Sequence, residues 1–244
     1  MKRTLRNLVL AGTIALSSLS PVKKALAEPV EPKDKKPISV SIDNNYASKY
    51  LFLGLSFSEG PVWQPTLNVS RGNLSSFLMA NKDLTTKEFN EFDLGLNWNI
   101  PILRDTSLSL GTIYFPAKVE GEWKSIGTSY AALNSGPLSV KLGKLWGAVG
   151  GTYVGINYSK DYPVSKKITV SNSTSIVSND GIFRDKKGLT HFETTLTGSL
   201  ALTDKLDVNA QVVWINPLSD DMDGQLCFRT NVSYRLTKKP EVQK

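Results

Sequence analysis

The 244-residue chain has one cysteine and one histidine, and after residue 27 it lacks any long uncharged apolar run. A transmembrane helix needs about 20 apolar residues in succession, so no such helix is available in the remaining chain. Cys227 has no partner for an internal disulfide, and the fold must therefore depend on hydrogen bonding and packing. A zinc site needs several Cys or His ligands. We therefore expect neither a metal nor another cofactor.

A large excess of basic residues is also missing once the N-terminal segment is set aside. Residues 1–27 combine a basic start, an uncharged apolar stretch from Leu8 to Leu19 and an Ala25-Leu26-Ala27 ending, which predicts a cleaved export signal. This segment holds five of the 29 basic residues and none of the 22 acidic ones. The mature chain carries a net charge of only about +2, so its charge gives no reason to expect nucleic acid as a partner.

What the chain has in abundance is a two-residue alternation of apolar and small polar side chains. Every second residue from Phe92 to Ile102 is hydrophobic, and polar or small residues lie between them. The same alternation returns at 225–236, where Cys227 falls in the polar row. Successive strand side chains point to opposite faces, so each segment predicts a strand with one apolar and one polar face. After an export signal, such strands predict an all-β, outer-membrane β-barrel.

Turn signals divide residues 38–236 into about twelve strands of an antiparallel up-and-down barrel. Residues 28–37 are predicted to be a periplasmic linker, and residues 237–244 a flexible tail. If both termini are periplasmic, the shorter turns should lie on the periplasmic side. Because two connections on the outer side are also short, a barrel of ten strands remains an alternative. The strands are expected near 38–57, 62–71, 74–82, 88–101, 106–116, 124–133, 137–146, 150–160, 167–178, 189–203, 206–216 and 225–236. The periplasmic turns are expected near 72–73, 103–105, 134–136, 161–166 and 204–205.

Aromatic residues lie mostly near the ends of these predicted strands. Amphipathic rings favour the membrane–water boundary, so they predict the aromatic girdles of a membrane barrel. Packing in the core of a soluble sandwich is the alternative, but the opposite rows are uniformly small and polar. The girdle candidates are Trp63, Trp98, Trp123, Trp146, Trp214, Tyr50, Tyr114 and Tyr158.

Part of the chain resembles a known family. Residues 50–57 (Tyr-Leu-Phe-Leu-Gly-Leu-Ser-Phe) and 60–65 (Gly-Pro-Val-Trp-Gln-Pro) are similar to the opening of the TorF family of porin-like outer-membrane proteins. Shorter similarities extend the resemblance over about residues 40–170, and it implies an outer-membrane barrel with a pore. Leu53 stands where the family usually has an arginine. The final strand is followed by a tail, whereas many such barrels end on an aromatic residue.

Charged residues in the polar rows are the candidates for function. In a porin, such charges set the field that a permeant solute crosses. In a small barrel they can instead pair and fill the interior. A barrel of ten to twelve strands is intermediate in size between eight-stranded barrels, which side chains fill, and 16-stranded porins, which are open. The sequence therefore leaves an open and a filled lumen as alternatives. The lumen-facing candidates are Asp93, Lys141, His191, Glu193, Asp207, Arg229 and Arg235.

Catalysis finds little support in the sequence. His191 and Glu193 share a predicted strand face, but a lipid-modifying hydrolase also needs a nucleophile and an oxyanion hole. The stretch 219–224 matches a calcium loop only in part, because Thr230 stands where the bidentate glutamate belongs. We predict a non-enzymatic outer-membrane porin for passive diffusion of small hydrophilic solutes. The alternatives are a non-conducting structural or surface-binding barrel and a lipid-modifying enzyme. The expected partners are small hydrophilic solutes, outer-membrane lipids and lipopolysaccharide, and the barrel-assembly machinery.

Overall fold

The computed structural model describes residues 36–53, 55–58, 60–119, 121–180, 187–218 and 224–237. The predicted export signal, most of the predicted linker and nearly all of the predicted tail lie outside these residues, so their boundaries stay predictions. In the described part of the chain, no helix is long and apolar enough to cross a membrane.

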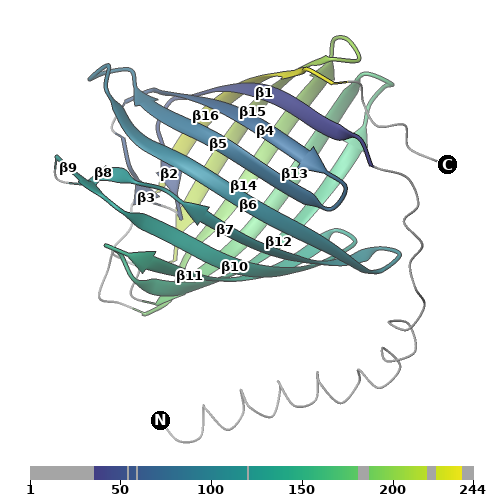
Figure 1. Cartoon of the computed structure of the whole chain (residues 1–244). Coiled ribbons are helices and arrows are strands. Elements are labelled where there is room, and N and C mark those ends of the chain that lie inside the picture. The colour runs from purple at the N-terminus through teal and green to yellow at the C-terminus, as the bar shows by residue number, and fades with distance from the viewer. Residues whose placement is uncertain are drawn as a thin grey trace, which may run out of the picture. The chain divides into compact units, whose positions relative to one another are not determined.

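Twelve long strands form one closed antiparallel sheet, which confirms the predicted barrel (Figure 1). β1 pairs with both β4 and β16, so the first and last strands close the sheet, with Ser41 opposite Arg235. The long strands are β1 (Ile38–Ala47), β4 (Val62–Arg71), β5 (Leu74–Asp83), β6 (Phe89–Leu103), β7 (Thr106–Tyr114), β10 (Ile126–Ser135), β11 (Leu138–Gly147), β12 (Gly151–Pro163), β13 (Ile168–Asp180), β14 (Lys187–Ala201), β15 (Leu206–Pro217) and β16 (Gln225–Arg235). The short strands are β2 (Leu51–Phe52), β3 (Leu55–Ser56), β8 (Ala117–Val119) and β9 (Glu122–Lys124).

The two ends of the barrel differ in their connections. At the end where β1 begins and β16 ends, here called the terminus end, the turns are short and lie at 72–73, 104–105, 136–137, 164–167 and 202–205. Gly72 (φ 59°) and Gly136 (φ 53°) provide the left-handed backbone that tight hairpins require. At the opposite end, here called the far end, the connection between β7 and β10 contains the β8–β9 hairpin, which pairs with β6.

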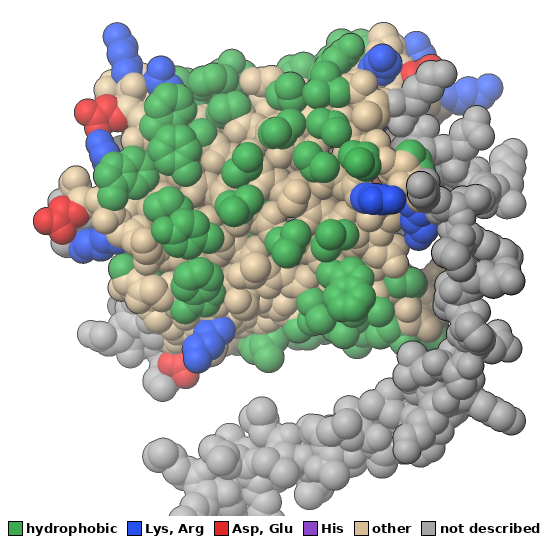
Figure 2. Space-filling model, in the orientation of Figure 1, with side chains coloured by type: hydrophobic (Ala, Val, Ile, Leu, Met, Phe, Trp, Pro, Cys, Tyr) green, Lys and Arg blue, Asp and Glu red, His purple; other side chains and the backbone are tan. Residues whose placement is uncertain are grey.

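The outer face of the barrel is apolar. On β6, the side chains of Leu94, Leu96 and Trp98 are about half exposed, whereas the polar row between them points inward. Figure 2 shows hydrophobic side chains spread over the visible wall, with charged side chains gathered toward its two ends. An exposed apolar belt around a closed sheet is the surface that lipid requires.

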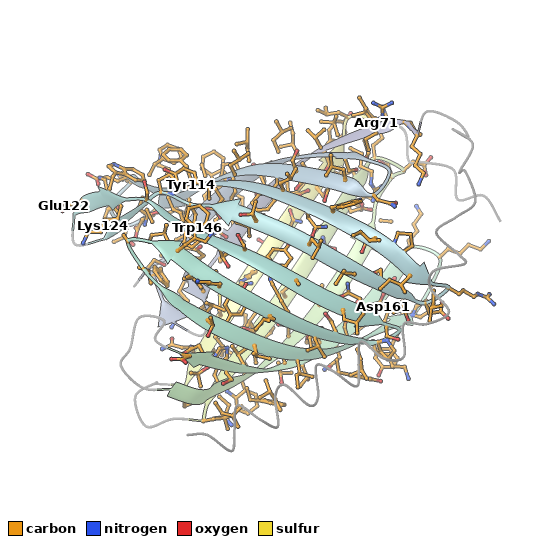
Figure 3. The ribbon with its side chains drawn as sticks, turned by 60° about the horizontal axis from the view of Figure 1, so that its bottom comes forward. Arg71, Tyr114, Glu122, Lys124, Trp146 and Asp161 are labelled. Carbon is orange, nitrogen blue, oxygen red and sulfur yellow. The ribbon has the colours of Figure 1, made fainter. Side chains whose placement is uncertain are left out.

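Stacked aromatic rings lie on the outer face at the far end. Tyr114 stacks on Trp146 with ring centroids 6.2 Å apart, and Phe92 stacks on Trp123 at 5.7 Å. In Figure 3, Tyr114 and Trp146 lie near Glu122 and Lys124 at one end of the wall, with Arg71 and Asp161 toward the other. Rings beside a charged rim form the predicted girdle on this side. Tyr50 was predicted to join it and does not, because it lies inside the barrel.

The predicted strand over 38–57 is wrong beyond its first half. β1 ends at Ala47, which pairs with Val62 at the start of β4. The Ser48 amide still donates to the Phe228 carbonyl oxygen (2.8 Å), and the chain then leaves the wall and forms the short β2–β3 hairpin. Leu53 in this hairpin has a positive φ of 49°. The side chains of Leu51, Phe52 and Leu53 therefore pack inside the barrel and do not face lipid.

Candidate functional site: a lumen crossed by one segment

Strand register identifies the side chains that line the lumen. Ala47, Val62, Val213 and Cys227 are all at most 4% exposed, and they occupy the row opposite the exposed apolar belt. Following the paired registers around the barrel assigns one inward row to every long strand. Nearer the terminus end these rows consist mostly of Ser, Thr, Asn, Gln and charged residues. The register places all seven predicted lumen candidates in the inward rows.

Residues 48–61, which we call the crossing segment, bridge the lumen at the far end. Leu51 packs in a buried cluster with residues of β1, β4, β15 and β16, among them Val62 and Cys227. Phe52 and Leu53 pack against a second cluster that includes Ile126 and Leu145 of β10 and β11. In the order of strands around the barrel, these two groups of strands lie on opposite walls. One short hairpin therefore spans the full width of the interior.

Hydrogen bonds fasten the beginning of the crossing segment to the wall. Lys49 Nζ donates to Gln225 Oε1 (2.7 Å), and the Cys227 thiol donates to the Lys49 carbonyl oxygen (3.3 Å). The Tyr50 hydroxyl donates to Glu91 Oε1 on β6 (2.7 Å). Burial raises the pKa of the Tyr50 phenol well above its usual value, and Glu91 adds to this shift. The phenol therefore stays protonated and remains a donor.

Within the segment, the two sides of the hairpin hold each other. The Tyr50 amide donates to Ser58 Oγ and the Phe57 amide donates to the Tyr50 carbonyl oxygen (2.7 and 2.8 Å). The ring of Phe52 meets Phe57 and Phe115 edge-on at centroid distances of 6.0 and 5.6 Å. The described residues of the segment thus form a folded element with its own contacts.

The predicted lumen charges are distributed around the wall and do not form one cluster. Asp207 and Arg235 form an ion pair at the terminus end. Lys141 lies over the ring of Tyr130, with Nζ 4.0 Å from the centroid, and 5.7 Å from that of Tyr153. A lysine held over two rings is stabilised by cation–π attraction. These three charges are therefore held by other groups of the wall.

Glycine makes room for the two rings that hold Lys141. Tyr130 lies across Gly111 and donates to Asn97 Oδ1 (3.1 Å), and a Cβ on Gly111 would stand 2.3 Å from the ring. Tyr153 lies across Gly143 in the same way, at 2.2 Å. Each ring therefore lies directly against the backbone of the neighbouring strand.

His191 and Glu193 were considered as a pair, but no hydrogen bond or ion pair between them is present. The Thr190 hydroxyl lies 3.1 Å from His191 Nδ1 and donates its proton to the Val177 carbonyl oxygen (3.0 Å). The hydroxyl is then the acceptor for Nδ1, so a hydroxyl orients the imidazole. Glu193 instead accepts from Thr195 (3.5 Å). In a Ser-His-Asp arrangement a carboxylate orients the histidine, and Glu193 does not orient His191 in this way.

Asp93 and Arg229 are half-buried on two separated parts of the wall. Asp93 Oδ1 has no hydrogen-bond partner, and no ion pair or hydrogen bond joins Arg229 to any described residue. Among the described residues, no cluster of three or more His, Cys, Asp and Glu side chains could hold a metal ion. Arg229 is therefore the predicted candidate that the described residues leave open to the lumen, whereas Asp93 Oδ1 is buried in the wall.

Glu91 and the crossing segment are the functional parts that sequence reasoning missed. Glu91 precedes the alternating run that begins at Phe92, and extending that run by one residue would have placed it in the row of Asp93. The inward fold of residues 48–61 has a weaker signal. Near Val213 and Ile215, both the inward and the outward row of β15 are apolar. A strand with lipid on one side and water on the other needs only one apolar row, so the second apolar row indicates that another part of the chain covers it.

Two cavities show the contrast between the faces of the wall. A polar cavity of about 410 Å³ at the terminus end is lined by Asp43, Lys167, Asn209 and Asn231, among others. A groove of about 670 Å³ is lined mainly by outer-row side chains such as Leu67 and Leu78, and so it belongs to the lipid-facing surface. The site of interest is the lumen.

Solved structures with a similar fold are porins and channels of outer membranes. A NanC porin superposes with a TM-score of 0.52 at 14% identity, covering 81% of this chain and 100% of its own. A KdgM porin in complex with disordered oligogalacturonate gives 0.52 at 14%, covering 80% and 98%. An outer-membrane channel from Pseudomonas putida F1 gives 0.50 at 12%, covering 85% and 100%. No protein-family model matches the chain, and a search of curated proteins finds no relative. At these identities the likeness concerns the fold, which is that of a twelve-stranded porin-like barrel.

Proposed function

We propose that this protein is an outer-membrane channel through which small hydrophilic solutes diffuse passively. The observation that carries the proposal is the inward row of polar and charged side chains around a closed wall, within an apolar outer belt. Water and polar solutes are stabilised by such a lining, and lipid by such a belt. The crossing segment narrows the path at the far end and would exclude larger solutes.

The surroundings of the barrel follow from the same proposal. A wall with an apolar belt and an aromatic rim suits an outer membrane, where lipids and lipopolysaccharide would contact it and the barrel-assembly machinery would insert it. The short turns at the terminus end favour a periplasmic location for that end, with the crossing segment on the outer side. The resemblance over residues 40–170 supports membership of the TorF family.

A non-conducting structural barrel is the second candidate, and one observation favours it. The crossing segment packs against opposite walls through two buried apolar clusters, and side chains such as Ile126 and Val62 are at most 1% exposed there. A segment held this firmly could close the path. A lipid-modifying enzyme is less well supported, because His191 is oriented by a hydroxyl and not by Glu193.

Planar bilayers containing the purified full-length protein test the proposal. We expect stepwise conductance from the wild type, and a larger conductance when residues 50–57 are replaced by a Gly-Ser sequence of equal length. A matched control replaces residues 202–205, the turn between β14 and β15 at the terminus end, in the same manner, and its conductance should match the wild type. If the wild type and the variant are both silent although correctly inserted, the channel is excluded and the structural barrel stands.

A further inference from the structure

A group of buried oxygen atoms lies where the crossing segment meets β5 and β6. Glu91 is 4% exposed and Asn81 is 0% exposed. The register places Asn81 on β5 directly opposite Glu91 on β6, and Asp93 is the next inward residue along β6. The hydroxyl of Tyr50, in the crossing segment, donates to Glu91 Oε1 (2.7 Å). We call these four residues, Tyr50, Asn81, Glu91 and Asp93, the oxygen cluster.

The oxygen cluster contains more hydrogen-bond acceptors than donors. Asn81 Oδ1 and Asp93 Oδ1 are both buried, and neither has a hydrogen-bond partner. The Asn81 amide nitrogen donates to Asn90 Oδ1 (2.5 Å), so the carbonyl oxygen is the unpartnered end of this side chain. The carboxyl groups of Glu91 and Asp93 are hydrogen-bonded to each other. Buried acceptors without donors are costly, and a bound ion is one of the arrangements that satisfy them.

No basic side chain among the described residues forms an ion pair with the two carboxyl groups. Arg229 lies within electrostatic reach of Tyr50 but makes no such pair with Glu91 or Asp93. Lys82 follows Asn81 in the chain but points to the outer face, where its Nζ lies 5.5 Å from the centroid of the Phe89 ring. Buried carboxylates in proteins are paired with a cationic side chain or coordinate a metal ion, and the cluster lacks the first.

We propose that the oxygen cluster is a structural calcium site that fastens the crossing segment to β5 and β6. Carboxylate and amide carbonyl oxygens are the ligands that Ca²⁺ takes, and they require no histidine or cysteine. Mg²⁺ keeps several of its waters, which suits a covered site less well. The ion replaces the proton that Glu91 and Asp93 share, and two carboxylates then balance its charge. It is held beneath the segment and is not a permeating solute, so the inference does not depend on conduction.

Calcium binding to the full-length protein, refolded in detergent without lipopolysaccharide, measures the site directly. Equilibrium dialysis should show a Ca²⁺ ion bound to the wild type, and Glu91→Gln and Asp93→Asn should each lose it. Asn81→Asp adds a carboxylate and should bind Ca²⁺ several-fold more tightly, because the charge of the ligands tunes affinity. A misfolded variant would not show this gain. Asp223→Asn is the matched control, in the partial calcium loop of 219–224, and should bind as the wild type.

The labelling of Cys227 by a maleimide reports whether the ion fastens the segment. The thiol is fully buried and donates to the Lys49 carbonyl oxygen, so the reagent reaches it only when the segment leaves the wall. An ion that binds only the closed form should slow labelling about tenfold at about ten times its Kd. Mg²⁺ at the same concentration should have little effect. In Glu91→Gln the labelling rate should no longer respond to Ca²⁺.

Two results would overturn the inference. If the wild type binds no Ca²⁺, or loses it in Asp223→Asn but not in Glu91→Gln or Asp93→Asn, the two carboxyl groups share a proton only. If the cluster binds Ca²⁺ but Cys227 is labelled at the same rate with and without it, the ion does not fasten the segment. Silence in planar bilayers would exclude the proposed channel and leave the calcium site standing.

Discussion

The two halves of the barrel interior are built from different side chains. Toward the terminus end, the inward rows are hydroxyls, amides and charges around a polar cavity, whereas toward the far end they include two clusters of buried aliphatic and aromatic residues beside buried polar side chains such as Glu91 and His191. The outer face shows no such change, because exposed hydrophobic side chains lie on it at both levels. The difference teaches that the polar row of a barrel strand need not stay polar. It becomes apolar where another element of the chain covers it.

The largest expected effect comes from placing a charge in each half of the same inward row. Val213→Asp puts a carboxylate in the cluster that holds Leu51, and an uncompensated buried charge costs about 3–5 kcal/mol. Asn209→Asp puts the same group two inward positions away, in the polar cavity. Thermal unfolding in detergent should show a large drop in unfolding temperature for Val213→Asp and almost no drop for Asn209→Asp. Equal effects would show that the two halves do not differ as described.

The next effect compares the two faces of β16. Val232 lies in the lipid-facing row, so Val232→Arg should obstruct membrane insertion, since an arginine near the bilayer midplane costs about 2–4 kcal/mol. Arg229→Ser changes the inward row and should leave the barrel assembled. The amount of folded protein in outer-membrane fractions measures both. A tolerated Val232→Arg together with a failed Arg229→Ser would mean that the faces are exchanged.

Most of the barrel could be predicted from the sequence, because alternation and turn residues act locally. Eleven of the predicted strands, such as 62–71 and 206–216, match long strands of the sheet to within a few residues at their ends. Residues 48–57 could not be placed, because their apolar alternation suits a lipid-facing strand as well as a hairpin covered by the opposite wall. That choice depends on Ile126 and Leu145, which lie far along the chain. The pairing of Tyr50 with Glu91 was missed for the same reason.

A third effect uses Cys227 as a reporter of the crossing segment. Its thiol is fully buried beneath Lys49, so reagents should reach it only when the segment leaves the wall. Leu51→Ala removes packing at the same cluster and should weaken the attachment by about 2–3 kcal/mol. Labelling of the thiol by a maleimide should then become much faster. Leu94→Ala removes a similar side chain on the lipid-facing side and should leave the labelling rate unchanged.

The smallest effect concerns one hydrogen bond of the same attachment. Tyr50→Phe keeps the ring but removes the donor to Glu91, which is 4% exposed and loses this partner. A buried acceptor left without its partner costs about 1–3 kcal/mol, much of which is recovered if the segment moves and water reaches the carboxylate. Labelling of Cys227 should therefore accelerate, but less than in Leu51→Ala. Tyr46→Phe, on the outer face of β1, is the matched control and should behave as the wild type. If Tyr50→Phe labels no faster than this control, the hydrogen bond does not hold the segment, and the apolar clusters alone fix it across the lumen.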